Sequence, residues 1–378
     1  MTAEKPLRIF HINMHHKWGG QPNRILTTAL GLRARGHHVC VSGPKGAMLV
    51  ERAGAQGLAA FDDLELHRGF RPASMWRDIK ALEAHFRAEK YDVIDTHGSQ
   101  DTWASAFALR RLAAGERPAF VRTRHNIFPV AKHPLNRWLY RQIDHVVTIS
   151  PQVIPLMEGL LPAEAFTAIY SAPDPKRFDV GDCRAAVREE LDVAADAEIV
   201  GVVARLAPEK GHRVLLDAAP AILEARPQVR FIFVGTGRSR PAIEEQAAAL
   251  GIADRVILTG FREDVPRLLQ AFDLFVLPPI SGESLGTSIL EAFLMERPVV
   301  ATDVGGVRES VRDGETGRLV PAENPAALAE AILDQLSHPN RAKDWARAGK
   351  ALVEAEFTPE MIGRKTEDVY RRVLAARR

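Results

Sequence analysis

Residues 281–302, which read SGESLGTSILEAFLMERPVVAT, restrict the fold of this chain more than any other stretch. They follow an apolar run at 274–277, LFVL, whose length and composition are typical of a buried strand. Apolar side chains between 289 and 294 recur at helical spacing, so we expect a helix whose cap is Ser284 or Thr287. A strand, a glycine-containing loop and a helix in succession form the repeating unit of a parallel α/β sheet.

The loop before this helix has the features of an anion site. Gly282 and Gly286 let the backbone approach a ligand closely, and the N–H groups of Gly286 and Thr287 lie at the positive end of the helix dipole. Two carboxylates flank this point. We expect Glu283 to bind hydroxyl groups near the helix start, and Glu291, about two turns along, to bind a ribose diol. The alternative is a pair of ordinary surface glutamates.

The two glutamates and the residues after them carry a family resemblance. Glu283 and Glu291 are separated by seven residues and followed by RPVVAT at 297–302. This pattern resembles the signature of the retaining family 4 glycosyltransferases, which have the GT-B fold, and similarities continue along almost the whole chain. The resemblance implies an α/β protein of two Rossmann-like domains, whose parallel sheets face a cleft, and a C-terminal helix that returns to the first domain.

The resemblance also implies domain boundaries. We expect an acceptor-binding domain at 1–172, a nucleotide-sugar-binding domain at 173–356, and the returning helix at 357–378, with Tyr370 as a packing residue. At the domain junction, Ser171-Ala172 replaces the Asn-Gly that is usual in the family.

Length and composition agree with two soluble-type domains. The chain has 378 residues, of which 46% are hydrophobic, but no run of about 18 apolar residues and no signal-peptide pattern. Its two cysteines, Cys40 and Cys183, are isolated from each other in the sequence, which suits a reducing compartment. We therefore expect a cytoplasmic protein, with peripheral attachment to the inner face of the membrane as an option.

Charge is distributed unevenly along the chain. Residues 1–172 hold 22 basic and 15 acidic side chains, and residues 102–142 hold eight basic residues and one acidic. Aromatic and basic residues alternate at 128–141, as they would in a segment that contacts a membrane or an anionic lipid-linked glycan. A solvated basic helix with a core-facing tryptophan explains the same pattern. No feature favours nucleic acid as a partner.

The first half opens with a strand at 7–13, a loop containing Gly19-Gly20, and a helix. The resemblance places this loop at the donor phosphate or the acceptor, so Gly19 and Gly20 are candidate binding residues. His11, His15 and His16 raise the question of a metal, but no nearby carboxylate or cysteine completes a ligand set, and we expect none.

Further strands are expected at 38–42, 92–97, 120–123 and 146–149, with a helix at 81–90. Polar residues that end such strands line clefts. By resemblance, His125 contacts the transferred sugar; His97 is the second choice, and a histidine that merely satisfies a loop is the alternative.

The second half begins with a strand at 198–204, followed by Arg205 and Lys210. Two cations at a strand end can neutralise a diphosphate without a metal, and the family uses these positions for that purpose. Gly235 and Gly237 follow the next strand and are candidate binding residues, but Arg240 occupies the third glycine position of a dinucleotide fingerprint, which disfavours NAD.

The backbone at Phe261 and Arg262, after a strand at 256–260, meets the nucleobase in the family. The sequence thus predicts a retaining, metal-independent glycosyltransferase with no cofactor, for which a UDP-sugar is favoured as donor and GDP-mannose is next. Its acceptor is expected to be a lipid-linked, lipopolysaccharide or polysaccharide glycan of the cell envelope. Alternatives are a phosphorylase or sucrose-type synthase with a soluble acceptor, a non-catalytic nucleotide-sugar sensor, and a dehydrogenase.

Overall fold

The computed structural model describes residues 5–67, 69 and 71–377. The chain forms two compact units. The N-terminal unit comprises Met1–Ala172 together with Pro359–Arg378, and the C-terminal unit comprises Pro173–Thr358. Each unit contains one parallel sheet with helices on both faces, so the predicted pair of Rossmann-like domains is confirmed.

The sheet of the N-terminal unit has seven parallel strands, in which β1 pairs with β2 on one side and with β4 on the other. Its central strands are buried along almost their whole length because both of their faces are covered. In spatial order the strands are β3 (Ala59–Phe61), β2 (His38–Ser42), β1 (Arg8–Ile12), β4 (Val93–Thr96), β5 (Ala119–Arg124), β6 (His145–Thr148) and β7 (Phe166–Ala168).

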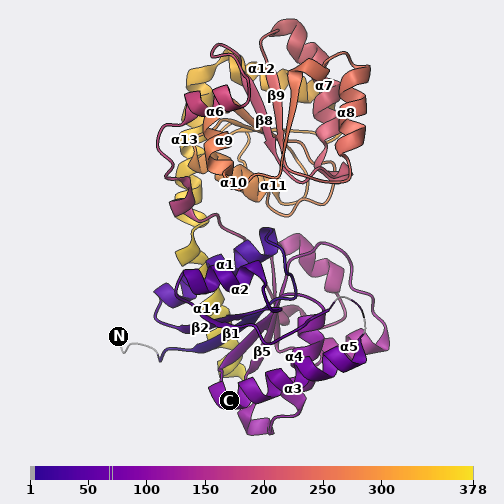
Figure 1. Ribbon diagram of the computed structural model, residues 1–378, viewed down its shortest axis with the longest axis vertical. Coiled ribbons are helices and arrows are strands. Elements are labelled where there is room, and N and C mark those ends of the chain that lie inside the picture. The colour runs from indigo at the N-terminus through magenta and orange to yellow at the C-terminus, as the bar shows by residue number, and fades with distance from the viewer. Residues whose placement is uncertain (1–4, 68, 70, 378) are drawn as a thin grey trace. The chain divides into compact units, whose positions relative to one another are not determined.

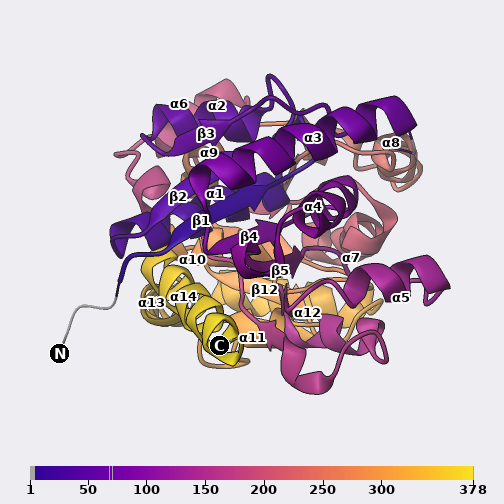
Figure 2. The same ribbon diagram turned by 90° about the horizontal axis from the view of Figure 1, so that it is seen from below.

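Helices cover both faces of this sheet. Helix α14 packs on α1, and α3 packs on α4; Figure 2 shows α14 and the α3–α4 pair on opposite sides of β1, β4 and β5, and Figure 1 shows the same helices beside β1 and β5. The helices are α1 (Gly20–Ala34), α2 (Met48–Ala55), α3 (Pro72–Glu89), α4 (Gln100–Arg110), α5 (Pro134–Tyr140) and α14 (Pro359–Ala376).

Close backbone contact joins α14 to the N-terminal unit. A Cβ atom on Gly31 of α1 would lie 2.2 Å from the carbonyl oxygen of Pro359, and one on Gly363 would lie 2.6 Å from the backbone of Gly31. Only glycine permits this approach. The fully buried Tyr370 packs into the unit and donates a hydrogen bond of 2.7 Å to Asp95 on β4. The end of the chain is therefore an integral part of the N-terminal unit.

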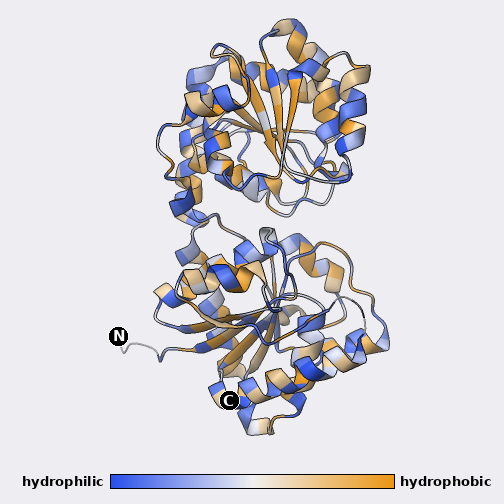
Figure 3. Ribbon diagram, viewed as in Figure 1, coloured by the Kyte–Doolittle hydropathy of each residue, from blue (hydrophilic) through white to orange (hydrophobic). Residues whose placement is uncertain are grey.

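The C-terminal unit has a six-stranded parallel sheet whose strands are strongly hydrophobic, as Figure 3 shows. In spatial order the strands are β10 (Val256–Gly260), β9 (Arg230–Val234), β8 (Ile199–Val203), β11 (Leu274–Leu277), β12 (Val299–Thr302) and β13 (Arg318–Val320). The helices are α6 (Arg184–Glu190), α7 (His212–Ala225), α8 (Arg240–Ala249), α9 (Val265–Ala271), α10 (Thr287–Leu294), α11 (Val307–Ser310), α12 (Pro325–Ser337) and α13 (Pro339–Glu356).

Two expectations about helices need correction. The helix expected at 81–90 begins much earlier, at Pro72. The sequence pattern did not indicate its first turns because they are more polar and partly exposed. Neither Ser284 nor Thr287 caps α10; the cap residue is Gly286, in a left-handed conformation with φ of 70°. Among the described helices, none has an apolar stretch long enough to cross a membrane.

Candidate functional site

The loops at the carboxyl end of the C-terminal sheet interlock through glycines. A Cβ atom on Gly211 would lie 1.7 Å from the carbonyl oxygen of Pro278, and the amide of Ile280 donates a hydrogen bond of 3.0 Å to the carbonyl of Glu209. The loop after β8 is thereby fixed against the loop after β11. In a parallel α/β sheet this edge is where ligands bind.

Lys210 and Glu283 meet at this edge. Lys210 Nζ lies 2.6 Å from Glu283 Oε2, and the two side chains are only 19% and 9% exposed. Glu283 Oε1 accepts hydrogen bonds from the amides of Ser284, at 3.1 Å, and Gly286, at 3.3 Å. The carboxylate of Glu283 thus occupies the anion position at the start of α10 that the sequence assigned to a ligand.

A third loop, which follows β12, contacts the backbone of Glu283. A Cβ atom on Gly305, whose φ is 59°, would lie 1.9 Å from the carbonyl oxygen of Glu283, and the amide of Gly306 donates 3.2 Å to the same oxygen. Ser310 Oγ donates to the carbonyl of Leu285. The glycine pair after β12 therefore sets the position of the Glu283 backbone.

The other predicted charged residues have distinct environments. Arg205 is 68% exposed and pairs with Glu209 at 2.8 Å, so its guanidinium is within reach of solvent. Glu291 lies half-buried on α10, and burial raises the pKa of its carboxyl to about 7, an effect that the charge of Arg177 partly offsets. Helix α10 contacts the short 3-10 helix that carries Arg177 (Pro175–Phe178).

The structure gives protein-packing reasons for two predicted binding glycines. Cβ atoms on Gly235 and Gly237 would each lie 2.1 Å from a carbonyl oxygen of the loop after β8, those of Ala204 and Leu206. These contacts account for both glycines without a ligand.

Phe261 and Arg262 differ in their surroundings. The Phe261 side chain is among the most exposed large apolar groups, with 62% of its surface accessible. Arg262 forms ion pairs with Glu190 and with Asp264, both at 2.6 Å, and these partners raise the pKa of its guanidinium. The Arg262 side chain is therefore committed within the protein, and its backbone alone stays a candidate for nucleobase contact.

Gly19 and Gly20 face open space in the N-terminal unit. Among the described residues, no atom lies within 4 Å of a Cβ placed on either residue. They help to line a cavity of about 610 Å³, whose walls are formed by residues 14–22 together with Leu66 and His67. Gln21 ties this loop to the sheet by donating hydrogen bonds of 2.9 Å to Asn13 Oδ1 and to the carbonyl of His97.

His125 and His97, the first and second choices for the sugar contact, bond to each other. His97 Nδ1 lies 2.9 Å from His125 Nε2, and His97 Nε2 lies 2.9 Å from Nδ1 of the fully buried His11. Burial lowers the pKa of all three rings, to about 3 for His11.

A carboxylate completes this cluster, contrary to the reasoning from the sequence. Ligand-type atoms of His11, Asp95 and His97 lie within 4.8 Å of one another, a grouping that could hold a metal ion. The direct bond between the two histidine nitrogens instead fits a shared proton, so we interpret the cluster as a hydrogen-bonded chain.

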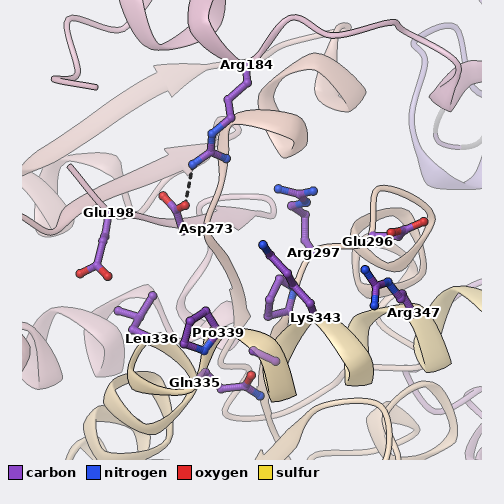
Figure 4. Close-up of a pocket in the computed structure, with 12 residues that line it drawn as sticks. Arg184, Glu198, Asp273, Glu296, Arg297, Gln335, Leu336, Pro339, Lys343 and Arg347 are labelled. Carbon is purple, nitrogen blue, oxygen red and sulfur yellow. Dashed lines mark hydrogen bonds and ion pairs between the residues drawn. The ribbon is translucent and has the colours of Figure 1, made fainter. Parts of the chain in front are cut away.

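A second cavity in the C-terminal unit, of about 570 Å³, lies at the amino ends of β8, β11 and β12 (Figure 4). Its polar groups are used for internal contacts: Arg184 pairs with Asp273 at 2.5 Å, and Arg297 donates to the carbonyl of Phe272 at 3.0 Å. These arginines cover the carboxyl end of α9, where the helix dipole is negative. The cavity is therefore distinct from the Lys210–Glu283 site at the opposite sheet edge.

The two Rossmann-like units and the returning helix have the architecture of the GT-B glycosyltransferases. Two glycosyltransferase family profiles match successive halves of the chain: Glycosyltransferase Family 4 over residues 18–177 and Glycosyl transferases group 1 over residues 197–338. The chain belongs to the family 4 glycosyltransferases of the GT-B fold, as its sequence signature predicted.

Individual proteins agree with this assignment. The alpha-D-kanosaminyltransferase of Streptomyces kanamyceticus is 32% identical over 65% of this chain and 66% of its own length. The GDP-mannose-dependent alpha-(1-6)-phosphatidylinositol monomannoside mannosyltransferase of Mycolicibacterium smegmatis is 27% identical over 86% of this chain and 88% of its own. The crystal structure of HepE from Anabaena with UDP and glucose superposes with a TM-score of 0.80 at 22% identity, covering 96% and 99% of the two chains.

The chain thus spans just under two thirds of the kanosaminyltransferase and nearly all of the mannosyltransferase. The HepE likeness concerns the fold.

Sequence reasoning missed several participants. The sequence indicated only a strand at Asp95 and a packing role for Tyr370. The two residues, 275 positions apart in the sequence, form a hydrogen bond with each other. Arg177, whose charge partly offsets the effect of burial on the pKa of Glu291, lies in a stretch whose sequence did not indicate a role at the site. The one available hint was the polar run Asp95-Thr96-His97 at the end of an apolar strand.

Proposed function

We propose that this protein transfers a sugar, with retention of anomeric configuration and without a metal, from a nucleotide-sugar to a glycan acceptor. The observation that carries the proposal is the Lys210–Glu283 pair at the start of α10. It joins a cation, a carboxylate and helix N-terminal amides at the carboxyl edge of the C-terminal sheet, where α/β proteins bind nucleotides.

The reaction requires stabilisation of a departing diphosphate. Negative charge develops on the phosphate as its bond to the anomeric carbon breaks. Lys210, the more exposed Arg205 and the first amides of α10 are positive groups that would stabilise this charge. When the diphosphate binds, Lys210 exchanges Glu283 for phosphate, which frees the Glu283 carboxylate to accept hydrogen bonds from sugar hydroxyls.

The nucleoside would lie along α10. Glu291, about a turn inside the helix start, is suited to accept hydrogen bonds from a ribose diol, and the backbone at Phe261 would meet the base. We favour a UDP-sugar as donor and GDP-mannose as the next choice. HepE was crystallised with UDP, and the name of the mycobacterial relative states dependence on GDP-mannose.

Retention would proceed by attack on the same face from which the diphosphate leaves, with the departing phosphate accepting the acceptor's proton. A double displacement would need a carboxylate free to attack the anomeric carbon. Glu283 is held by Lys210 and two amides, which suits a binding role better than a nucleophilic one.

The acceptor is proposed to be a lipid-linked, lipopolysaccharide or polysaccharide glycan. One relative is named for a phosphatidylinositol mannoside, and another, from Rhizobium meliloti, for lipopolysaccharide core biosynthesis. The N-terminal unit would bind it, and the cavity at Gly19-Gly20 is the candidate subsite.

A surface of the N-terminal unit supports peripheral contact with an anionic membrane. Trp103, Phe107 and Trp138 stack on one another with ring centroids 5.2–5.8 Å apart. Phe128 and Leu135 nearby in sequence are 70% and 66% exposed. Apolar groups beside basic ones are typical of interfacial segments.

The basic part of that surface is smaller than the sequence indicated. Arg122 and Arg124 are buried in β5, where Arg122 lies over the Tyr140 ring. Six of the eight basic residues remain exposed. Within the described chain, Arg111 pairs with Glu83, and five of these residues form no ion pair with a carboxylate: Arg110, Arg117, Lys132, Arg137 and Arg141.

A panel of UDP-, GDP- and ADP-sugars, with EDTA present, tests the proposal by thermal shift and by nucleotide release. Stabilisation by one nucleotide, weakened in Arg205→Ala and Glu291→Ala, together with release that an acceptor accelerates, would support it. Binding without any release would indicate a sensor. Release accelerated by phosphate or a simple sugar would favour the phosphorylase or sucrose-type alternative.

A further inference from the structure

Three histidines on adjacent strands of the N-terminal unit form a continuous chain of hydrogen bonds. His11 lies on β1, His97 follows β4 and His125 follows β5, and these strands are neighbours in the sheet. Both links, from His11 Nδ1 to His97 Nε2 and from His97 Nδ1 to His125 Nε2, measure 2.9 Å.

Each link requires one donor nitrogen and one acceptor nitrogen. A neutral imidazole carries a single N–H, so the choice of tautomer in one ring determines the choice in the next. The rings are neutral at neutral pH because burial lowers the pKa of His11 to about 3 and those of His97 and His125 well below the usual value. The chain therefore has two arrangements, with all protons directed outward or all directed inward.

The surroundings of His11, the innermost histidine, favour the outward arrangement. His11 Nε2 is buried and has no hydrogen-bond partner among the described residues. A buried N–H without an acceptor is rarer in proteins than a bare acceptor, so the His11 proton belongs on Nδ1. The Asp95 carboxylate, held by Tyr370 at 2.7 Å and Thr123 at 2.8 Å, has its Oδ2 3.8 Å from this same Nδ1 and its Oδ1 3.9 Å from His97 Nε2. Because it lies equally close to both rings, the direction is set by the unpartnered His11 Nε2.

We propose that His11 and His97 are positioning residues that fix His125 in the Nδ1–H tautomer. His11 Nδ1–H donates to His97, His97 Nδ1–H donates to His125 Nε2, and Nδ1–H is left as the one ring group of His125 available to a ligand. Free neutral histidine in water prefers the opposite tautomer, so the chain imposes a state that His125 alone would not adopt. If the proposed function holds, this N–H donates to a sugar oxygen.

Nitrogen-15 spectroscopy of the full chain, with labelled histidine and no ligand, tests the proposal directly. Long-range proton–nitrogen correlations distinguish a protonated ring nitrogen from a bare one, and the spectrum of His125→Gln identifies the His125 signals. The expected result is a single neutral tautomer protonated on Nδ1. A predominant Nε2–H form, or a fast average of both, would overturn the proposal.

Variants separate positioning from general structural damage. His97→Phe removes both ring nitrogens and should move His125 to the Nε2–H form. His97→Gln, whose amide can still donate to His125 Nε2, should restore Nδ1–H, and it serves as the second variant if His97→Phe does not fold. The matched control is His145→Gln, because His145 is also buried in this unit but bonds Thr167 at 2.9 Å instead.

Two results from these samples would contradict the proposed chain of hydrogen-bonded histidines. One is a His125 signal that is unchanged in His97→Phe. The other is a stoichiometric metal ion in the purified protein whose removal changes the His11 and His97 signals, because a metal would take the place of the shared proton. Since no donor is present, this experiment can succeed even if the sugar-transfer proposal fails, and the two outcomes stay separate.

Discussion

Lys210 and Glu283, which lie 73 positions apart, form a hydrogen-bonded ion pair with 2.6 Å between Nζ and Oε2. The pair is mostly shielded from water, where a charge pair is stronger than at the surface. Its carboxylate also receives two backbone amides, so the start of α10 is neutralised by the protein's own anion. A diphosphate must therefore compete with Glu283, and the side chain it displaces is the one proposed to hold the sugar.

The Gly305 contact predicts a loss of both stability and activity in Gly305→Ala. The added Cβ would clash with the Glu283 carbonyl at 1.9 Å, and the backbone has a positive φ of 59°. We expect a decrease of about 2–4 kcal/mol in the free energy of unfolding, measured by urea denaturation, and weaker donor binding.

Gly314→Ala is the matched control for that substitution. Gly314 has a φ of 74°, but no atom of the described residues lies within 4 Å of its added Cβ. It should cost only about 1 kcal/mol for the left-handed backbone and leave donor binding unchanged. Equal effects of the two variants on donor binding would show that the contact with Glu283 is unimportant.

The pKa of Glu291 predicts a pH-dependent stability difference between the wild type and Glu291→Gln. Burial raises this pKa from 4.5 to about 7, so the folded state binds the proton more tightly than the unfolded state. The carboxyl therefore contributes its stability below pH 4.5, and this contribution is lost as the pH rises to 7.

Urea denaturation at pH 4.5 and pH 8 measures this difference. Glu291→Gln should match the wild type at the lower pH and exceed it at pH 8 by at most about 3 kcal/mol. A difference between the two proteins that does not vary with pH would contradict the raised pKa.

Glu296→Gly is predicted to stabilise the protein. Glu296 follows α10 with a φ of 52°, a left-handed conformation that glycine adopts without strain. Relief of about 1–2 kcal/mol outweighs the loss of its half-exposed ion pair with Lys350, because surface pairs contribute about 0–1 kcal/mol. A higher Tm in thermal unfolding is expected; Lys350→Ala, which removes only the ion pair, is the control. A Tm for Glu296→Gly below that of Lys350→Ala would contradict the strain argument.

The membrane proposal predicts that Phe128→Ser and Leu135→Ser weaken sedimentation with anionic vesicles. Each removes a largely exposed apolar group from the basic surface of the N-terminal unit, so binding should fall several-fold per substitution. Leu250→Ser, at another exposed apolar residue but in the C-terminal unit, should have no effect. Unchanged sedimentation in both test variants, or no binding by the wild type, would exclude this surface.

The fold was predictable where strands are covered on both faces. The strands β8 and β11 are continuous apolar runs and β1 is mostly apolar, and the predicted ranges agree with the observed ones within two residues at each end. The edge strands β3, β7 and β13 have three residues each and are partly exposed, so no long apolar run marks them.

The sequence named candidate site residues but not the contacts between them. Local sequence placed Lys210 and Glu283 at strand ends, yet their pairing depends on loops joined by Gly211 and Gly305. The histidine chain could not be predicted for a similar reason: it depends on strand order, and the Asp95 carboxylate beside it is held by Tyr370, far away in the sequence. The catalytic and binding roles themselves stay predictions.

The most direct test of the central claim compares nucleotide release from the preferred sugar donor by the wild type, Lys210→Ala and Lys210→Arg, in EDTA. The account predicts that Lys210→Ala lowers kcat by about 100-fold or more, because a cation that stabilises the departing diphosphate is lost. Lys210→Arg, which keeps the charge, should recover part of that activity. Release by Lys210→Ala at the wild-type rate would contradict the assignment of the Lys210–Glu283 edge as the site of reaction.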